Sequence, residues 1–193
     1  MRADYLKPQT YTRVFFLMQY PNVLALRLSL ETGLRIDDVL TLRPSNLHGT
    51  NLTFIAKKTG KPGKKKISTT LAREIKANSS AEWLFPGRKK GTHRTRQAVW
   101  RDVKKAAKAL KLDENVSPHS ARKTYAVQLR KEEGVAAVQK ELQHTHSDTT
   151  LLYAFADLAR RGEAFVPNDP ERLAELIAEK VVEKITKFFQ NNK

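Results

Sequence analysis

The sequence predicts an α+β domain that is mainly α-helical and carries one small antiparallel β-sheet. Three observations support this fold class. Apolar residues recur at helical spacing through most of the chain, and a single pair of short segments, 51–56 and 65–69, has the composition of paired strands. In addition, the pairs Ser117-Pro118 and Asp169-Pro170 each combine a helix-capping residue with a proline that suits the first helical position.

The N-terminal part of the chain predicts helical structure over residues 8–32 and 37–42. Apolar side chains follow helical spacing in the first of these segments, and Gly33 stands where the end of a helix favours a left-handed residue. Two acidic residues open the second helix, where they stabilise its positive N-terminal end. Pro44 ends this second helix, because a proline disfavours helical backbone at the residue before it.

The middle of the chain predicts a hairpin of strands 51–56 and 65–69, joined by turn-forming residues over 59–63 that include Lys61. A helix over 71–77 and a short extended piece over 83–85 follow.

Most of the remaining chain predicts helices, with polar loops between them. They cover 97–110, a segment from 118 past Leu129, 135–142, 148–158, and a C-terminal stretch from 170. We divide the chain into a domain over 1–166 and an amphipathic C-terminal helix over 167–193. The apolar stripe of that helix either closes the domain's own core or docks on a second copy of the chain, and the sequence leaves both open.

The charge of the chain indicates a polyanionic partner. The formal net charge is +16, and residues 57–111 hold 18 lysines and arginines against 3 acidic residues. Nucleic acid is the commonest partner for such a surface, although an anionic membrane or ribosomal RNA would satisfy the same charge. Residues 154–193 are neutral, with seven charges of each sign, which favours a protein contact for the tail.

Composition also excludes several classes of site. The chain has no cysteine, so disulfides, thiolate catalysis and cysteine-built zinc sites are impossible. No apolar stretch approaches the roughly 20 residues that a spanning helix needs, and the first residues do not form a secretory signal. We therefore expect a cytoplasmic protein without a membrane partner.

Three short patterns contain residues suited to phosphate chemistry. His119 and Arg122 share one face of a predicted first helical turn, where backbone N–H groups also favour an anion, although a plain solvated turn explains them equally well. Arg35 follows a helix-ending glycine and could point into a cleft or pair with Asp38 at the surface. Tyr153, taken alone, is more typical of a core or interface tyrosine.

The histidines His144 and His146 resemble a metal pair, but no third ligand lies near them in the sequence, so we expect no metal.

The order of these patterns resembles the catalytic domain of the tyrosine recombinases, the phage integrase family. The sequence reads Thr-Gly-Leu-Arg-x-x-Asp, then Lys-Thr-Gly-Lys on the hairpin, then His-x-x-Arg, then a histidine nine residues before a tyrosine. The resemblance covers about residues 9–156 and includes the connecting segments 40–47 and 83–87. It implies the tyrosine recombinase catalytic-domain fold and a DNA-cleaving and rejoining activity.

The resemblance also implies roles for individual residues. Those in catalytic positions are Arg35, Lys58, His119, Arg122, His144 and Tyr153, and Asp38 holds the acidic position that braces the first arginine. Tyr153 would be the nucleophile and form a 3′-phosphotyrosyl link. The two arginines would bind the phosphate, His119 would act as base or proton relay, and His144 would donate a hydrogen bond to the phosphate. Lys58 would protonate the departing 5′ oxygen.

Two departures from the family pattern concern the same region of the sequence. Gln143 replaces a glycine that usually precedes the histidine, and Asp148 lies in a variable stretch. Neither removes a functional group. Lys57 and Lys61 compete with Lys58 for the lysine position, so the sequence leaves three candidates.

The expected partner is double-stranded DNA, bound by a dimer or tetramer of the chain, and no cofactor is implied. Basic residues expected to contact DNA are Lys61, Lys64, Lys65, Lys66, Arg94, Arg96 and Lys123.

A type IB topoisomerase-like nicking and closing enzyme would share this chemistry. A non-catalytic DNA-binding protein with the same fold, or an RNA-binding protein, would explain the charge but not the ordered motifs. The family's N-terminal DNA-clamping domain has no room in 193 residues, so we expect an excised domain or a short member.

Overall fold

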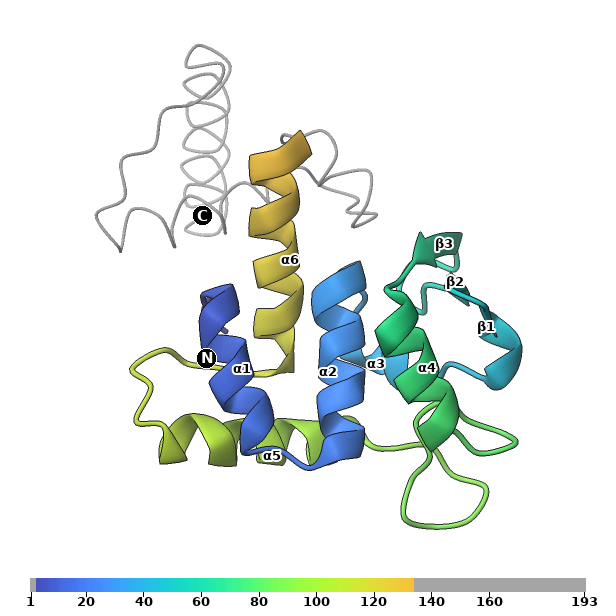
Figure 1. Ribbon diagram of the computed structural model, residues 1–193, viewed down its shortest axis with the longest axis horizontal. Coiled ribbons are helices and arrows are strands. Elements are labelled where there is room, and N and C mark those ends of the chain that lie inside the picture. The colour runs from blue at the N-terminus through green and yellow to red at the C-terminus, as the bar shows by residue number, and fades with distance from the viewer. Residues whose placement is uncertain (1–2, 134–193) are drawn as a thin grey trace, which may run out of the picture. The chain divides into compact units, whose positions relative to one another are not determined.

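Helix α2 (Tyr20–Thr32) is the central helix of the computed structural model, which describes residues 3–133 of the chain. Other elements lie on several sides of α2 (Figure 1). Most of its apolar side chains are buried, as expected for a helix with several neighbours. The helices that pack on it are α3 (Ile36–Leu40), α4 (Thr69–Asn78), α5 (Arg96–Ala109) and α6 (Pro118–Glu133). The predicted mainly helical α+β class with a small antiparallel sheet is confirmed.

The predicted helical segment 8–32 forms two helices. Helix α1 (Pro8–Phe16) ends before residues 17–19, and α2 then begins at Tyr20. The carboxylate of Asp102, on α5, accepts hydrogen bonds from the Gln19 backbone nitrogen at 2.8 Å and the Asn22 side chain at 2.7 Å. These hydrogen bonds from α5 fix the backbone at the start of α2, just after the break between the two helices.

The sheet has three antiparallel strands in the order β1 (Leu47–His48), β2 (Asn51–Ile55) and β3 (Pro62–Lys66). Side chains alternate between the two faces of a strand. Leu52 and Phe54 of β2 are buried, and they stand opposite Lys65 and Gly63 of β3. Lys65 therefore lies on the face of the sheet that carries the core residues.

The predicted hairpin was correct in its first strand and wrong in its second. The second strand covers Pro62–Lys66 instead of 65–69, because the turn closes earlier: the Gly60 and Lys61 backbone groups both bond to Ala56. Ser68 caps α4 instead of continuing the strand. The extended piece expected at 83–85 is a series of bends, and β1 was not predicted.

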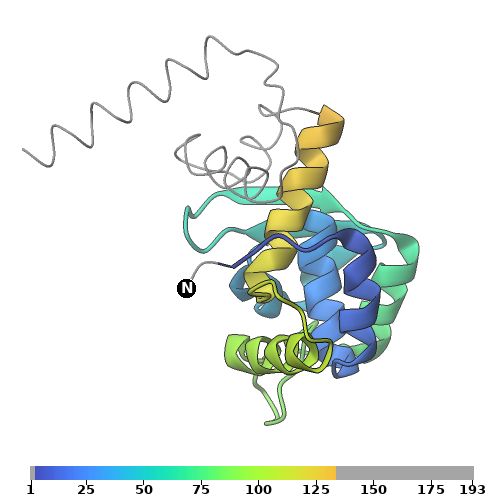
Figure 2. The ribbon, with the colours of Figure 1, turned by 90° about the vertical axis from the view of Figure 1, so that its left-hand side faces the viewer.

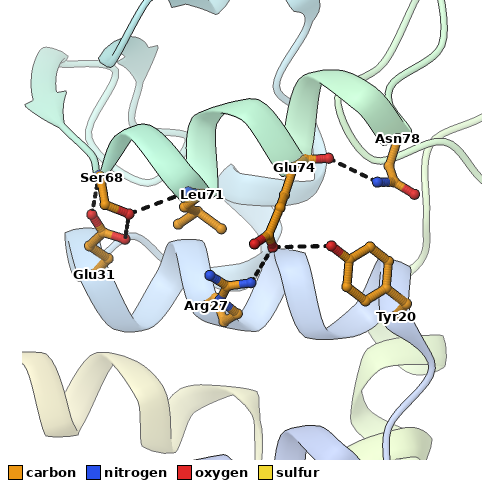
Figure 3. Close-up of polar contacts among 7 residues, drawn as sticks. All are labelled: Tyr20, Arg27, Glu31, Ser68, Leu71, Glu74 and Asn78. Atoms are coloured by element: carbon orange, nitrogen blue, oxygen red, sulfur yellow. Dashed lines mark hydrogen bonds and ion pairs between the residues drawn. The ribbon is translucent and has the colours of Figure 1, made fainter.

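Helix α4 is joined to α2 by two groups of polar contacts, one at Glu74 and one at Glu31 (Figure 3). The Glu74 carboxylate accepts from the Tyr20 hydroxyl at 3.1 Å and forms an ion pair with Arg27. At the other end, the Glu31 carboxylate accepts from the Ser68 backbone nitrogen and hydroxyl, just where Ser68 caps α4. These contacts place the hairpin that precedes α4 against the end of α2.

The segment before α1 lies alongside α6 (Figure 2). The Thr124 hydroxyl donates to the Leu6 carbonyl oxygen at 2.9 Å, and Leu6 is fully buried. Asp4 and Asn115 exchange two hydrogen bonds, at 3.1 and 2.9 Å, so the loop that leads into α6 is fixed by the N-terminal segment.

Within residues 3–133, no helix has the length and apolar character to cross a membrane. The helices predicted over 135–142, 148–158 and from 170, and the proposed boundary between 166 and 167, fall outside the described residues and stay predictions.

Candidate active site

The first turn of α6 carries a histidine and an arginine on one side of the helix. Pro118 occupies the first helical position, and the Ser117 hydroxyl accepts a hydrogen bond from the His119 amide at 3.3 Å. His119 and Arg122 stand three residues apart, so their side chains lie on the same face. His119 is exposed, whereas Arg122 is buried.

The corner between α2 and α3 positions a second arginine. Gly33 takes the predicted left-handed conformation with φ of 70°, which allows the chain to turn directly after α2. The Ser29 hydroxyl donates to the Leu34 carbonyl oxygen at 2.7 Å and fixes this turn. Arg35 follows as the N-cap residue of α3, with extended backbone and a half-buried side chain.

A hydrogen bond across the fold brings these two elements together. The buried guanidinium of Arg122 donates to the carbonyl oxygen of Gly33, 89 residues earlier in the chain. Since Gly33 is two residues from Arg35, this bond sets the position of α6 relative to the corner that carries Arg35.

The two arginines and the histidine line one pocket with a volume of about 450 Å³. Its wall comes from the α2–α3 corner, the start of α5 and the first turn of α6. The lining residues are Arg35, Ile36, Asp37, Arg96, Gln97, Trp100, Ser117, Pro118, His119 and Arg122. Asp37 and Arg96 form an ion pair at 3.3 Å within this set.

The pocket is electropositive, and this charge changes the protonation of its own residues. Burial, and then the charge of Arg35, lower the pKa of Arg122 to about 10, although Asp38 acts in the opposite direction. Although His119 is exposed as a residue, it lines the pocket, and partial desolvation there, followed by the charges of Arg122, Lys123 and Arg35, lowers the pKa of His119 to about 4. An anion in this pocket would offset the repulsion among these cations.

The hairpin between β2 and β3 places the candidate lysines at an exposed turn. Lys57, Lys58 and Lys61 are all exposed there. The Asp38 carboxylate accepts a hydrogen bond from the Lys57 backbone nitrogen at 3.0 Å. Asp38 therefore lies beside the hairpin, and its charge also acts on Arg122. The hairpin turn thus begins close to the pocket that contains Arg35 and Arg122.

Comparison with known proteins shows the family of the chain. The sequence profile of the phage integrase family matches residues 6–160. The chain belongs to the phage integrase family. It is 28% identical to tyrosine recombinase XerC of Mesorhizobium japonicum over 160 residues, which cover 77% of the chain and 51% of that protein. The chain spans about half the length of the curated relatives it matches.

Solved integrase structures share the fold of this family member. A lambda integrase dimer bound to a COC' core site matches with a TM-score of 0.69 and 20% identity, over 89% of this chain and 52% of that one. The catalytic domain of bacteriophage HP1 integrase matches with a TM-score of 0.62 and 18% identity, over 85% of this chain and all of the other.

The structure of this integrase-family chain brings together three of the six residues predicted to be catalytic: Arg35, His119 and Arg122 share the pocket. Lys58 lies on the exposed turn, and His144 and Tyr153 fall outside the described residues. Among residues 3–133, no group of three or more His, Cys, Asp or Glu side chains could hold a metal ion.

The basic residues predicted to contact DNA have different surroundings in the structure. Lys61, Lys64 and Lys66 are exposed, while Lys65 and Lys123 are half-buried. Arg96 lies at the pocket, and the Arg94 guanidinium donates to the Asn22 side chain at 3.0 Å, so part of its hydrogen-bonding capacity is used within the protein.

Sequence reasoning missed two aromatic residues near the site. Trp100 lines the pocket and is 48% exposed, and Tyr125 contacts Lys65 from α6. A signal existed for Trp100, since this large apolar residue falls between the apolar and basic faces of the predicted helix 97–110. Nothing in the sequence pairs Tyr125 with a strand 60 residues away.

Proposed function

We propose that this chain is the catalytic domain of a site-specific DNA recombinase or integrase that cuts and rejoins strands through a 3′-phosphotyrosyl intermediate. The observation that carries the proposal is the pocket in which Arg35, His119 and Arg122 meet. These side chains come from two segments that are far apart in the sequence. They form a cationic pocket suited to one phosphate group.

Two guanidinium groups suit the binding of a phosphodiester. Each presents several N–H donors in a planar fork, and charge-assisted bonds to the non-bridging oxygens stabilise the extra charge of the transition state. Arg122 is additionally fixed by its bond to Gly33, so it is held in place before the DNA arrives. Such preorganisation reduces the cost of ordering the site at the moment of reaction.

The covalent step is assigned to Tyr153. Its phenolic oxygen attacks the phosphorus, a phosphorus–oxygen bond to tyrosine forms, and the bond to the 5′ oxygen breaks. The tyrosine proton passes to His119, and Lys58 donates a proton to the departing 5′ oxygen, with His144 donating a hydrogen bond to the phosphate. Rejoining reverses these transfers.

The pKa of His119 fits this role only when the site is occupied. At about 4, its imidazole is neutral at pH 7 but a weak base. A bound phosphate would offset the charges of Arg35, Arg122 and Lys123 and raise the pKa of His119 towards its ordinary value, which would improve proton acceptance.

The partners follow from the same reasoning. The lambda integrase that shares this fold is a dimer bound to a core site, and we extend DNA binding and self-association, as a dimer or tetramer, to this chain. The C-terminal helix 167–193 is proposed to dock in cis or on a neighbouring copy. We propose that the chain acts in the cytoplasm of a prokaryote or of the host of a mobile element, and the bacterial origin of its relatives supports this.

The test uses a nicked suicide substrate that carries candidate target sites. The wild-type chain should form a covalent DNA adduct that survives denaturing electrophoresis, and Tyr153→Phe should form none. A folded, DNA-bound chain that gives no adduct on its cognate site would overturn the enzymatic proposal. Relaxation of supercoiled plasmid without strand exchange would favour a nicking and closing enzyme instead.

A further inference from the structure

Lys65 differs from the other lysines of β3 in where its side chain lies. Lys64 and Lys66 are exposed, but Lys65 is half-buried and stands opposite the fully buried Leu52. Partial burial of an ammonium group on the inward face of a sheet costs desolvation free energy. A role in surface charge alone therefore does not explain the position of Lys65.

The inward side chain meets α6 close to Arg122. The Lys65 ammonium donates a hydrogen bond to the Tyr125 hydroxyl at 3.2 Å and lies 5.2 Å from the centre of the Tyr125 ring. Tyr125 is three residues after Arg122, one turn along the same face of the helix. The contact therefore holds the ammonium one helical turn from Arg122, near enough for the two charges to interact.

The surroundings of Lys65 disfavour the charged form of its side chain. Burial, and then the charge of Arg122, lower the pKa of Lys65 to about 8, while Glu133 acts in the opposite direction. Placing a second cation against Arg122 destabilises the empty protein and favours a bound anion. Strongly shifted groups in such surroundings concentrate at functional sites.

We propose that Lys65 is a second lysine of the reaction site, whose ammonium group contacts the phosphodiester beside Arg122 and stabilises the charge of the transition state. This inference rests on the proposed function, and it separates Lys65 from the lysines that track the DNA backbone. Lys58 remains the proton donor to the 5′ oxygen. Tyr125 is a positioning residue, because it holds the ammonium without touching the phosphate.

The first experiment measures adduct formation in single turnover on the suicide substrate, with three variants. Lys65→Met should lower the rate at saturating DNA by about 10²-fold, the usual effect of removing one charge-stabilising donor, and Lys65→Arg should restore part of it. Lys64→Met should instead raise the DNA concentration needed for half-maximal cleavage. If folded Lys65→Met cleaves at the wild-type rate, Lys65 is only a structural tether and the proposal is wrong.

A second substrate separates charge stabilisation from proton donation. Replacing the bridging 5′ oxygen by sulfur gives a leaving group that needs no proton, because thiols are far more acidic than alcohols. This substrate should rescue Lys58→Met but not Lys65→Met. Rescue of Lys65→Met would overturn the role assigned to Lys65. Absence of any adduct from the wild-type chain would instead be a failure of the proposed function.

The pH profile supplies a readout that a structural tether would not change. The second-order rate of adduct formation reports the free protein, so it should fall as the pH rises through about 8 and Lys65 loses its proton. Among the described residues, the groups that act on or contact Lys65 include Arg122, Tyr125 and Glu133 on α6 and the apolar Leu52 on β2. The fall should move to higher pH in Lys65→Arg, and an unchanged profile would contradict the proposal.

Discussion

The guanidinium of Arg122 donates a hydrogen bond to the carbonyl oxygen of Gly33, and this bond joins the two halves of the candidate phosphate site. Gly33 ends α2 and Arg122 lies in the first turns of α6. The contact has two consequences. It satisfies the buried carbonyl oxygen of Gly33, and it fixes the position of the Arg122 guanidinium at the pocket. Changes to Arg122 should therefore affect stability and activity together, in proportions that depend on the substitution.

Arg122→Lys should separate these two effects. A lysine keeps the positive charge but presents no fork of donors, so it binds phosphate less specifically. We expect cleavage to fall by about 10²-fold or more. Stability should fall by about 1–3 kcal/mol if the Gly33 carbonyl oxygen loses its donor. Single-turnover adduct formation and chemical denaturation measure the two quantities, and wild-type cleavage in Arg122→Lys would contradict the assigned role.

The imidazole of His119 should titrate at about pH 4 in the free protein, well below the ordinary value for histidine. Nuclear magnetic resonance of the His119 ring measures this directly. Lys123→Ala should raise the pKa of His119, because it removes one of the charges that repel the imidazolium. Addition of a DNA duplex should also raise it. A free-protein value near 6.5 would contradict the electrostatic picture of the pocket.

The same residue should make stability depend on pH in one direction. The unfolded chain binds the His119 proton near pH 6.5 and the folded chain only near pH 4, so stability is lost as the pH falls through this window. His119→Gln should lose less stability than the wild type between these values. Thermal unfolding at a series of pH values tests the difference, and parallel curves for the two proteins would count against it.

The contact between Glu74 and Arg27 should contribute to stability and leave the chemistry unchanged, because it lies between α2 and α4 outside the pocket (Figure 3). Both side chains are partly exposed, so the coupling energy should be modest, about 0.5–1 kcal/mol. A double-mutant cycle with Arg27→Ala and Glu74→Ala measures it by denaturation. Tyr20→Phe, which removes one hydroxyl donor to Glu74, is a matched single-group variant.

Gly63→Ala should destabilise the sheet. Gly63 stands opposite Phe54 across the β2–β3 ladder, and an added Cβ would clash with that ring, because it would lie closer to three ring carbons than van der Waals radii allow. Because Phe54 is buried, its ring has little room to move, and we expect a loss of about 1–3 kcal/mol. Lys64→Ala on the same strand is a control for strand propensity alone, and equal stability of both variants would contradict the steric argument.

Much of the fold followed from local patterns in the sequence. The left-handed Gly33, the proline start of α6 at Pro118 and the apolar face of α5 were all predicted, because each depends on the conformational preferences of neighbouring residues. The second strand was misplaced since the register depends on where the turn closes, and the closing bonds to Ala56 involve backbone groups that composition does not reveal.

For the site, the sequence by itself was enough to nominate residues for phosphate chemistry, through the order of Arg35, His119 and Arg122 in their motifs. Only the tertiary structure decided how they meet. It joined Arg122 to the corner before Arg35 and turned Lys65 inward onto Tyr125. The physical reason is that these contacts join segments 60 to 89 residues apart, and the burial that shifts their pKa values exists only after the helices and sheet have packed.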